Sequence, residues 1–206
     1  TISIGPAGAM LGTLATPLAT PGAGVFAPGV MVSLTAAPGT EVRYTRNGGT
    51  PTPTSTLFLS PLTVSSTETI RARAFRAGWT ESAEMVAAYQ VDTTSPTIVA
   101  TVSPAPNEGG WHRSPVTVSF TCDDAQPVAV CPAPIVVNSE GTNLLVSGTA
   151  TDAVGNRAST SVILDIDLTA PTVGITSPTS SDIFAPGPAA ITATAFDGLS
   201  DIQSAT

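Results

Sequence analysis

Residues able to carry out nucleophilic or acid–base chemistry are few in this chain. His112 is the only histidine among 206 residues, so a Ser–His–Asp triad would depend on it alone. We expect His112 to be a loop residue at the start of a strand instead. Paired carboxylates could hydrolyse a glycosidic bond, but Asp is also a common turn residue, and the segments that hold these pairs are too small to enclose a substrate. The pairs are Asp123–Asp124, Asp165/Asp167 and Asp197/Asp201. The sequence therefore predicts no enzyme.

The two cysteines, Cys122 and Cys131, lie close together. A cytosolic pair at this spacing could be redox-active, but one histidine and no further cysteine cannot complete a zinc shell. We expect a structural disulfide, which would stabilise the folded state by roughly 2.5–3 kcal/mol. A disulfide indicates an oxidising compartment and so an extracellular or cell-surface protein.

Clustered acidic residues are the candidates for a metal site. Asp165 and Asp167 alternate with Ile166, so both side chains point to one face of a strand. Calcium prefers several oxygen ligands, which carboxylates and loop carbonyls supply, although no EF-hand motif is present. The alternative is that these residues are solvated carboxylates and that the protein has no cofactor. The expected calcium ligands are Asp92, Asp152, Asn156, Asp165 and Asp167.

Two tryptophans, Trp79 and Trp111, are the candidates for carbohydrate binding. An exposed flat ring can serve as a platform for a sugar. Each tryptophan also follows a glycine in a turn before a strand, where a ring commonly caps the core. Both roles stay open for each tryptophan.

Composition limits the classes of partner. The chain has a net charge of −8, no lysine and only 11% charged residues, so it lacks the basic stripe that nucleic-acid binding requires. Its acidity also disfavours anionic membrane surfaces, and no apolar run is long enough for a membrane span. Thr, Ser, Gly, Ala and Pro must cover most of the surface, as in secreted β-sandwich proteins.

A repeated join reveals the domain organisation. Residues 92–98 (DTTSPTI) recur as residues 167–173 (DLTAPTV), 75 residues later. This period suits a small independent domain. We expect a linker or the end of a preceding module at 1–20, a first module at 21–91, a second at 92–167 and the N-terminal part of a third at 168–206.

Short alternating runs between Pro and Gly residues predict strands and disfavour helices. Ile70, Ala72 and Ala74 alternate with Arg71 and Arg73, as in a strand with one buried face. The expected fold is all-β, with tandem immunoglobulin-like sandwiches joined by short Pro-containing linkers.

The first module contains a series of spaced motifs: 21–26 (PGAGVF), 32–34 (VSL), 38–45 (PGTEVRYT), 47–51 (NGGTP), 61–64 (PLTV), 69–74 (TIRARA) and 77–79 (AGW). With these motifs it resembles the chitobiase/β-hexosaminidase C-terminal-type domain, a small immunoglobulin-like sandwich appended to secreted bacterial glycosidases and surface proteins. Asn47 and Trp79 stand where that family usually has Asp and Tyr, and both changes preserve the turn and the aromatic packing.

The second module resembles a bacterial Ig-like repeat in residues 114–122 (SPVTVSFTC), in Cys131 and in residues 150–156 (ATDAVGN). Related arrays often hold calcium at their joins. The third module starts in the same way, but only two of its strands are expected before residue 206, so either the chain continues or another chain supplies the missing strands.

Together these features predict a non-catalytic extracellular spacer, stalk or adhesion segment of a larger bacterial surface or secreted protein. Its expected partners are adjacent modules of the same or a neighbouring chain and extracellular polysaccharide, without nucleic acid or membrane insertion. Two alternatives remain: a carbohydrate-binding accessory module of a secreted glycosidase, and a filament subunit completed by strands from a neighbouring chain.

Overall fold

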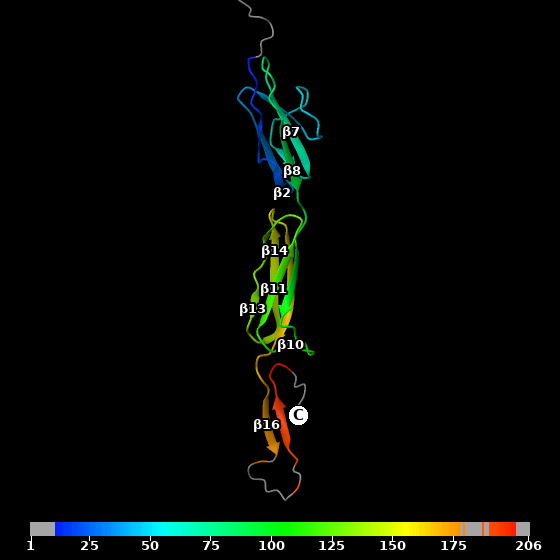
Figure 1. Cartoon of the computed structure of the whole chain (residues 1–206), viewed down its shortest axis with the longest axis vertical. Coiled ribbons are helices and arrows are strands. Elements are labelled where there is room, and N and C mark those ends of the chain that lie inside the picture. Colours follow the sequence, from blue (N-terminus) through cyan, green and yellow to red (C-terminus); the bar gives the residue numbers. More distant parts are fainter. Residues whose placement is uncertain (1–10, 178, 180–186, 188–189, 201–206) are drawn as a thin grey trace, which may run out of the picture. The chain divides into compact units, whose positions relative to one another are not determined.

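The computed structural model describes residues 11–177, 179, 187 and 190–200, and these contain strands but no helix (Figure 1). No helix among them is long and apolar enough to cross a membrane. The all-β prediction is therefore confirmed. The described residues form two compact units that divide between Thr94 and Ser95, and the turn Val154–Asn156 groups with the first unit.

The first unit contains two sheets of a β-sandwich. One sheet has the order β1-β3-β6, and the other has the order β2-β8-β7-β4-β5. Their strands are β1 (Leu18–Thr20), β2 (Gly24–Phe26), β3 (Val30–Thr35), β4 (Glu41–Thr45), β5 (Thr56–Leu57), β6 (Leu62–Val64), β7 (Glu68–Phe75) and β8 (Met85–Val91).

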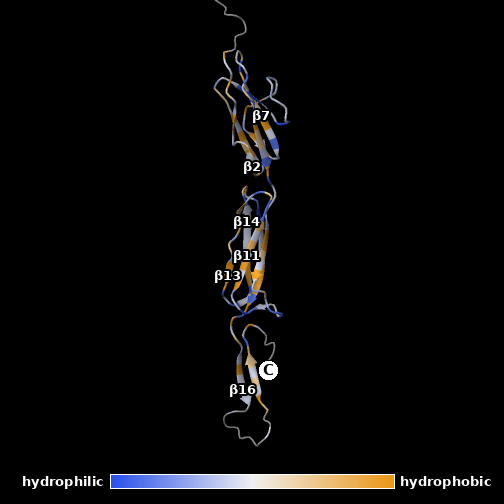
Figure 2. Cartoon of the chain, viewed as in Figure 1, coloured by the Kyte–Doolittle hydropathy of each residue, from blue (hydrophilic) through white to orange (hydrophobic). Residues whose placement is uncertain are grey.

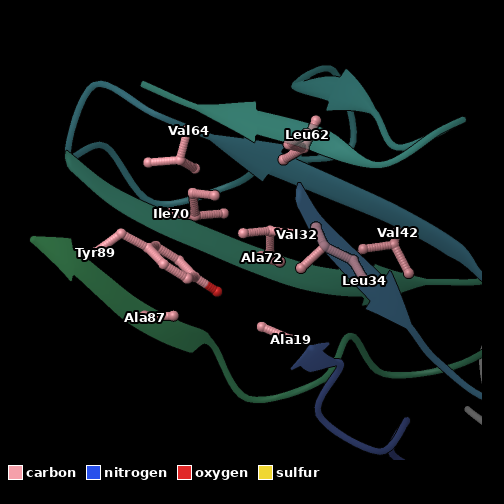
Figure 3. Close-up of a cluster of buried hydrophobic side chains, with 10 residues drawn as sticks. All are labelled: Ala19, Val32, Leu34, Val42, Leu62, Val64, Ile70, Ala72, Ala87 and Tyr89. Atoms are coloured by element: carbon pink, nitrogen blue, oxygen red, sulfur yellow. The ribbon is translucent and has the colours of Figure 1, made fainter. Parts of the chain in front are cut away.

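Alternation along β7 accounts for the core of this unit. Ile70, Ala72 and Ala74 are fully buried, whereas Arg71 and Arg73 lie on the opposite face, as the period of a strand requires. Figure 3 shows Ile70 and Ala72 among side chains from the facing sheet. Tyr89 from β8 is also fully buried, and its hydroxyl donates a hydrogen bond of 2.8 Å to the carbonyl oxygen of Pro21.

Residues 11–20 belong to the first unit, where the sequence predicted a linker or the end of a preceding module at 1–20. β1 pairs antiparallel with β3, and Leu14 and Ala19 are buried. The Leu and Ala residues of this segment do not alternate with polar residues at a period of two, so the sequence carries little strand pattern. The pairing therefore follows from tertiary contacts. Residues 1–10 lie outside the described residues.

The second unit also contains a sandwich with its own core. Its sheets have the orders β10-β15-β14-β12 and β13-β11-β9, and Figure 2 shows apolar residues along β11 and β13. Val116, Val118, Val146, Leu164 and Ile166 form the buried cluster between the sheets. The strands are β9 (Thr97–Ser103), β10 (Trp111–His112), β11 (Val116–Asp123), β12 (Val128–Val130), β13 (Ile135–Val137), β14 (Gly141–Asp152) and β15 (Arg157–Ile166).

Both units close in the same way. A short strand pairs in parallel with the last long strand, β2 with β8 in the first unit and β10 with β15 in the second. The backbone NH of the next residue then continues the ladder: Asp92 donates to Phe26 and Asp167 donates to His112, at 3.0 and 2.9 Å. Each aspartate at a join is thereby fixed by the sandwich that precedes it.

A two-stranded hairpin follows the second join. β16 (Thr172–Ser177) pairs antiparallel with β17 (Thr192–Phe196). β16 starts 75 residues after β9, at the expected repeat. Val173, Ile175 and Phe196 remain 66–71% exposed. Most of the intervening residues lie outside the described part of the chain.

Candidate functional site

The carboxylates at the two joins form the same turn. Oδ1 of Asp92 accepts a hydrogen bond from the backbone NH of Thr94 at 2.9 Å, and Oδ1 of Asp167 accepts one from Thr169 at 3.0 Å. Both aspartates are buried, with 7% and 6% of their surface exposed. An Asp side chain that binds the NH two residues later is an Asx turn, so the repeated sequence forms one local structure twice.

The second carboxylate oxygen differs between the two joins. Oδ2 of Asp167 accepts a hydrogen bond of 2.6 Å from the hydroxyl of Ser200. This bond, and then the one from the backbone NH of Thr169, lower the pKa of Asp167 below 3.8 against the opposing effect of burial. Oδ2 of Asp92 is buried without a hydrogen-bond donor. A buried, unpaired carboxylate oxygen is costly and fits a ligand for a cation.

The remaining expected calcium ligands have varied surroundings. Asp152 ends β14 and is buried, while Asn156 is partly buried in the following turn. Oδ1 of Asp165 accepts a hydrogen bond of 2.7 Å from the backbone NH of Asn143. Within the described residues, no three His, Cys, Asp or Glu side chains form a group that could hold a metal ion. A calcium site that also uses backbone carbonyls stays a prediction, and Asp92 is the ligand that fits it best.

Cys122 and Cys131 form the expected disulfide, with an S–S distance of 1.99 Å and a Cα–Cα distance of 5.9 Å. Cys122 lies in β11, and Cys131 directly follows β12. Because β11 and β12 belong to different sheets, the bridge fastens the two sheets of the second unit together. The disulfide prediction is confirmed.

Trp79 is held in a turn at the end of β7. Its backbone NH donates to the carbonyl of Arg76 at 3.1 Å, and the guanidinium carbon of Arg76 lies 5.4 Å from the centre of the indole ring. Gly12 packs against the ring so closely that a Cβ there would lie 3.1 Å from Cζ3. Hydrogen bonds from Leu11 to Gly78 and from Thr80 to Gly12, both 2.8 Å, fasten this contact. The ring remains partly exposed.

The partly exposed ring of Trp79 lines an open cleft of about 800 Å³. Phe75 and Pro53 add apolar surface, and Arg76, Glu41 and Glu81 add charged groups. Glu41 and Phe75 are cross-strand partners in β4 and β7, so the cleft lies where β4 begins and β7 ends. The remaining lining residues are Gly39, Ala77 and Thr80.

Arginine–glutamate pairs neutralise the charges beside this cleft. Arg43 contacts Glu41 at 2.6 Å, and Arg73 pairs with Glu81. Arg76 belongs to none of the four ion pairs among the described residues. Arg76, Glu41 and Glu81 were not predicted as cleft residues. Arg76 and Glu81 are near Trp79 in the chain, whereas only the register of β4 with β7 brings Glu41 beside them.

Trp111 lies in a different environment. It pairs with Asp165 in the register of β10 and β15 and is partly buried, whereas the neighbouring His112 is buried, with 4% exposed. His112 is therefore a buried strand residue rather than a loop residue. Its Nδ1 has no hydrogen-bond partner. Trp79 belongs to the first unit and Trp111 to the second.

The paired carboxylates are engaged in turns. Oδ1 of Asp124 accepts from the backbone of Gln126 at 2.9 Å, and Oδ1 of Asp197 accepts from Leu199 at 3.1 Å. Oδ2 of Asp124 is buried without a donor. Asp201 lies outside the described residues. Turn formation accounts for these positions without hydrolytic chemistry.

Comparison with known proteins identifies the first unit. No curated protein significantly matches the chain. The family model of the chitobiase/beta-hexosaminidase C-terminal domain matches residues 21–87, which confirms the resemblance of the first module and indicates a non-catalytic accessory module of a glycosidase-type protein. The match and the disulfide both indicate an extracellular protein. Residues 21–87, within the first unit, are therefore similar to the chitobiase/beta-hexosaminidase C-terminal domain.

Proposed function

We propose that the chain is a non-catalytic structural segment, a spacer or stalk, of a larger bacterial surface or secreted protein. The observation that supports this most is that each unit has a separate buried core, one around Ile70 and Tyr89 and the other around Val116 and Leu164. Independent sandwiches joined by a short Pro-containing segment resist extension by their interstrand hydrogen bonds, and Pro restricts bending at the join.

The role as a spacer requires each unit to bear load separately. In an optical trap with attachment points at residues 11 and 177, the oxidised protein should extend in two separate unfolding steps. Reduction should lengthen only the step of the second unit, by about 25–30 Å, because the chain closed between Cys122 and Cys131 can then extend at up to ~3.6 Å per residue. A single step, or extension without resistance, would contradict the proposal.

A filament subunit is the second candidate, and the hairpin of β16 and β17 favours it. Val173 and Ile175 lie on one exposed face of β16, and isolated two-stranded hairpins are marginally stable in water. In this candidate, a second copy of the chain covers that face. Sedimentation should then show concentration-dependent assembly that Ile175→Asp abolishes. A monomer at all concentrations would exclude the filament.

A further inference from the structure

We propose that the cleft lined by Trp79, Arg76, Glu41 and Glu81 binds a segment of a neutral polysaccharide. This inference does not depend on the structural role proposed above. It concerns the first unit alone, because every lining residue lies between Gly39 and Glu81. It also assigns a ligand class to the open cleft rather than to a tryptophan alone.

One wall of the cleft is apolar. Trp79 and Phe75 present ring surface to the cleft, with Pro53 beside them. Ring faces and edges contact the apolar C–H surface of a sugar favourably, because aromatic side chains combine a large apolar area with a polarised π-system. One ring and its neighbours can therefore hold one face of a pyranose.

The wall is held in place before any ligand binds. Gly12 packs against the indole ring, and the backbone bonds of Leu11 and Thr80 tie the segment of Gly12 to the turn of Trp79. Gly39 lies beside the guanidinium of Arg76, since a Cβ there would be 3.7 Å from it, at ordinary van der Waals distance. A fixed site loses little conformational entropy when a ligand binds.

The polar groups of the cleft suit hydroxyl groups. Arg76 is exposed and provides N–H donors, and no ion pair among the described residues occupies them. The side chains of Glu41 and Glu81 are 59% and 45% exposed. A carboxylate has about four acceptor positions, so each retains free positions beside its arginine. A sugar hydroxyl donates and accepts, and so can use both kinds of group.

The charges of the cleft nearly cancel, because Glu41 and Glu81 are paired with arginines and Arg76 alone is left over among the described residues of the cleft, so no strong net charge attracts an ionic ligand. An anionic polysaccharide that reached Arg76 would also face the carboxylates of Glu41 and Glu81. A cationic ligand that reached these carboxylates would face Arg76 and the arginines already paired with them. A neutral ligand meets neither repulsion. The cleft volume of about 800 Å³ lies within the range of small-ligand sites, and its open shape suits a stretch of chain.

The test uses the whole 206-residue chain with Trp111→Phe, so that Trp79 is its only tryptophan. Its fluorescence is followed during titration with cellohexaose and chitohexaose as neutral probes and with oligogalacturonate as an anionic probe. We expect at least one neutral probe to bind, and Arg76→Ala to weaken that binding at least about tenfold. Arg157→Ala, which removes an exposed arginine from β15 of the second unit, is the matched control and should leave the affinity unchanged.

Trp79→Ala in the otherwise unaltered protein provides the second test, by equilibrium dialysis against the same probes. Thermal unfolding of each variant reports whether the first unit is folded, and Arg76→Ala carries the test if Trp79→Ala is unfolded. Three results would overturn the proposal: no neutral probe binds, only oligogalacturonate binds, or folded Arg76→Ala binds as tightly as the parent. If no neutral probe binds but the protein still unfolds in two steps in the optical trap, the binding site is refuted while the spacer role stands.

Discussion

Asp92 and Asp167, 75 residues apart, make the same Asx turn but differ at the second carboxylate oxygen. In both, Oδ1 accepts the backbone NH two residues later. Oδ2 of Asp167 accepts the hydroxyl of Ser200, whereas Oδ2 of Asp92 is buried without a donor. One sequence motif therefore produces one turn with two electrostatic environments, and each environment predicts a different response to solution conditions.

Acid should destabilise the turn at Asp167. The pKa of this carboxyl is lower in the folded protein than its ordinary value of 3.8, so the folded state binds fewer protons than the unfolded state near that pH. The resulting stability is present above pH 3.8 and is lost as the pH falls through the lower, folded value. Carboxyl ¹³C shifts against pH measure this pKa directly. Ser200→Ala should raise the pKa of Asp167, and an unchanged pKa would contradict the contact.

Calcium should stabilise the protein through Asp92. Millimolar calcium is expected to raise the thermal midpoint and a chelator to lower it, because a ligand that binds only the folded state shifts the equilibrium towards it. Asp92→Asn keeps an oxygen for the NH of Thr94, removes the charge and should abolish the shift. Asp123→Asn, an exposed carboxylate, is the control. A midpoint that does not respond to the chelator would exclude a stabilising site.

Removal of the disulfide should weaken only the second unit. Cys122→Ser with Cys131→Ser opens a loop of nine residues' separation, which on the chain-entropy estimate costs about 2.5 kcal/mol. Denaturant unfolding followed by the fluorescence of Trp111, in a Trp79→Phe background, should show this loss of stability. The unfolding transition reported by Trp79, in a Trp111→Phe background, should not change. An unaltered midpoint at Trp111 would show that the bridge does not constrain the unfolded chain.

Gly148 in β14 should not tolerate a methyl group. A Cβ at Gly148 would lie 2.6 Å from the ring of Phe120, so Gly148→Ala must displace the ring within a packed core at a cost of about 1–3 kcal/mol. Gly22→Ala is the control, because a Cβ at Gly22 would meet no neighbouring atom within 4 Å. Equal stability of both variants, measured by urea unfolding, would contradict the packing around Phe120.

Alternating burial explains why the fold class could be predicted from the sequence. Ile70 and Ala72 alternate with arginines, and Val116 and Val118 alternate with Thr117, so strands and their buried faces follow from a period of two residues. The disulfide followed from the count of cysteines. The pairing of residues 11–20 with the first unit could not be predicted, because the apolar residues of that segment do not alternate with a period of two. The segment gains its structure from contact with β3 and Thr80.

The cleft illustrates the same limit for the candidate site. Trp79 is recognisable from the sequence as an aromatic candidate, and Arg76 lies in the same turn, but Gly12 and Glu41 come from distant places in the chain. Their proximity depends on the register of β4 with β7 and on a backbone contact with residues 11–14. Likewise, Oδ2 of Asp92 has no donor, whereas Oδ2 of Asp167 has the hydroxyl of Ser200. The similar sequence motifs at the two joins do not reveal this difference.

Each unit folds around its own core, and the fluorescence of the two tryptophans, one in each unit, allows a direct test of this. Urea unfolding is followed by fluorescence in Trp111→Phe, which reports the first unit, and in Trp79→Phe, which reports the second. We predict that Ile70→Ala lowers the free energy of unfolding of the first unit alone, by about 2–5 kcal/mol. Val118→Ala should lower that of the second unit alone, by less because valine is smaller. Coincident transitions that move together in both variants would contradict separate cores.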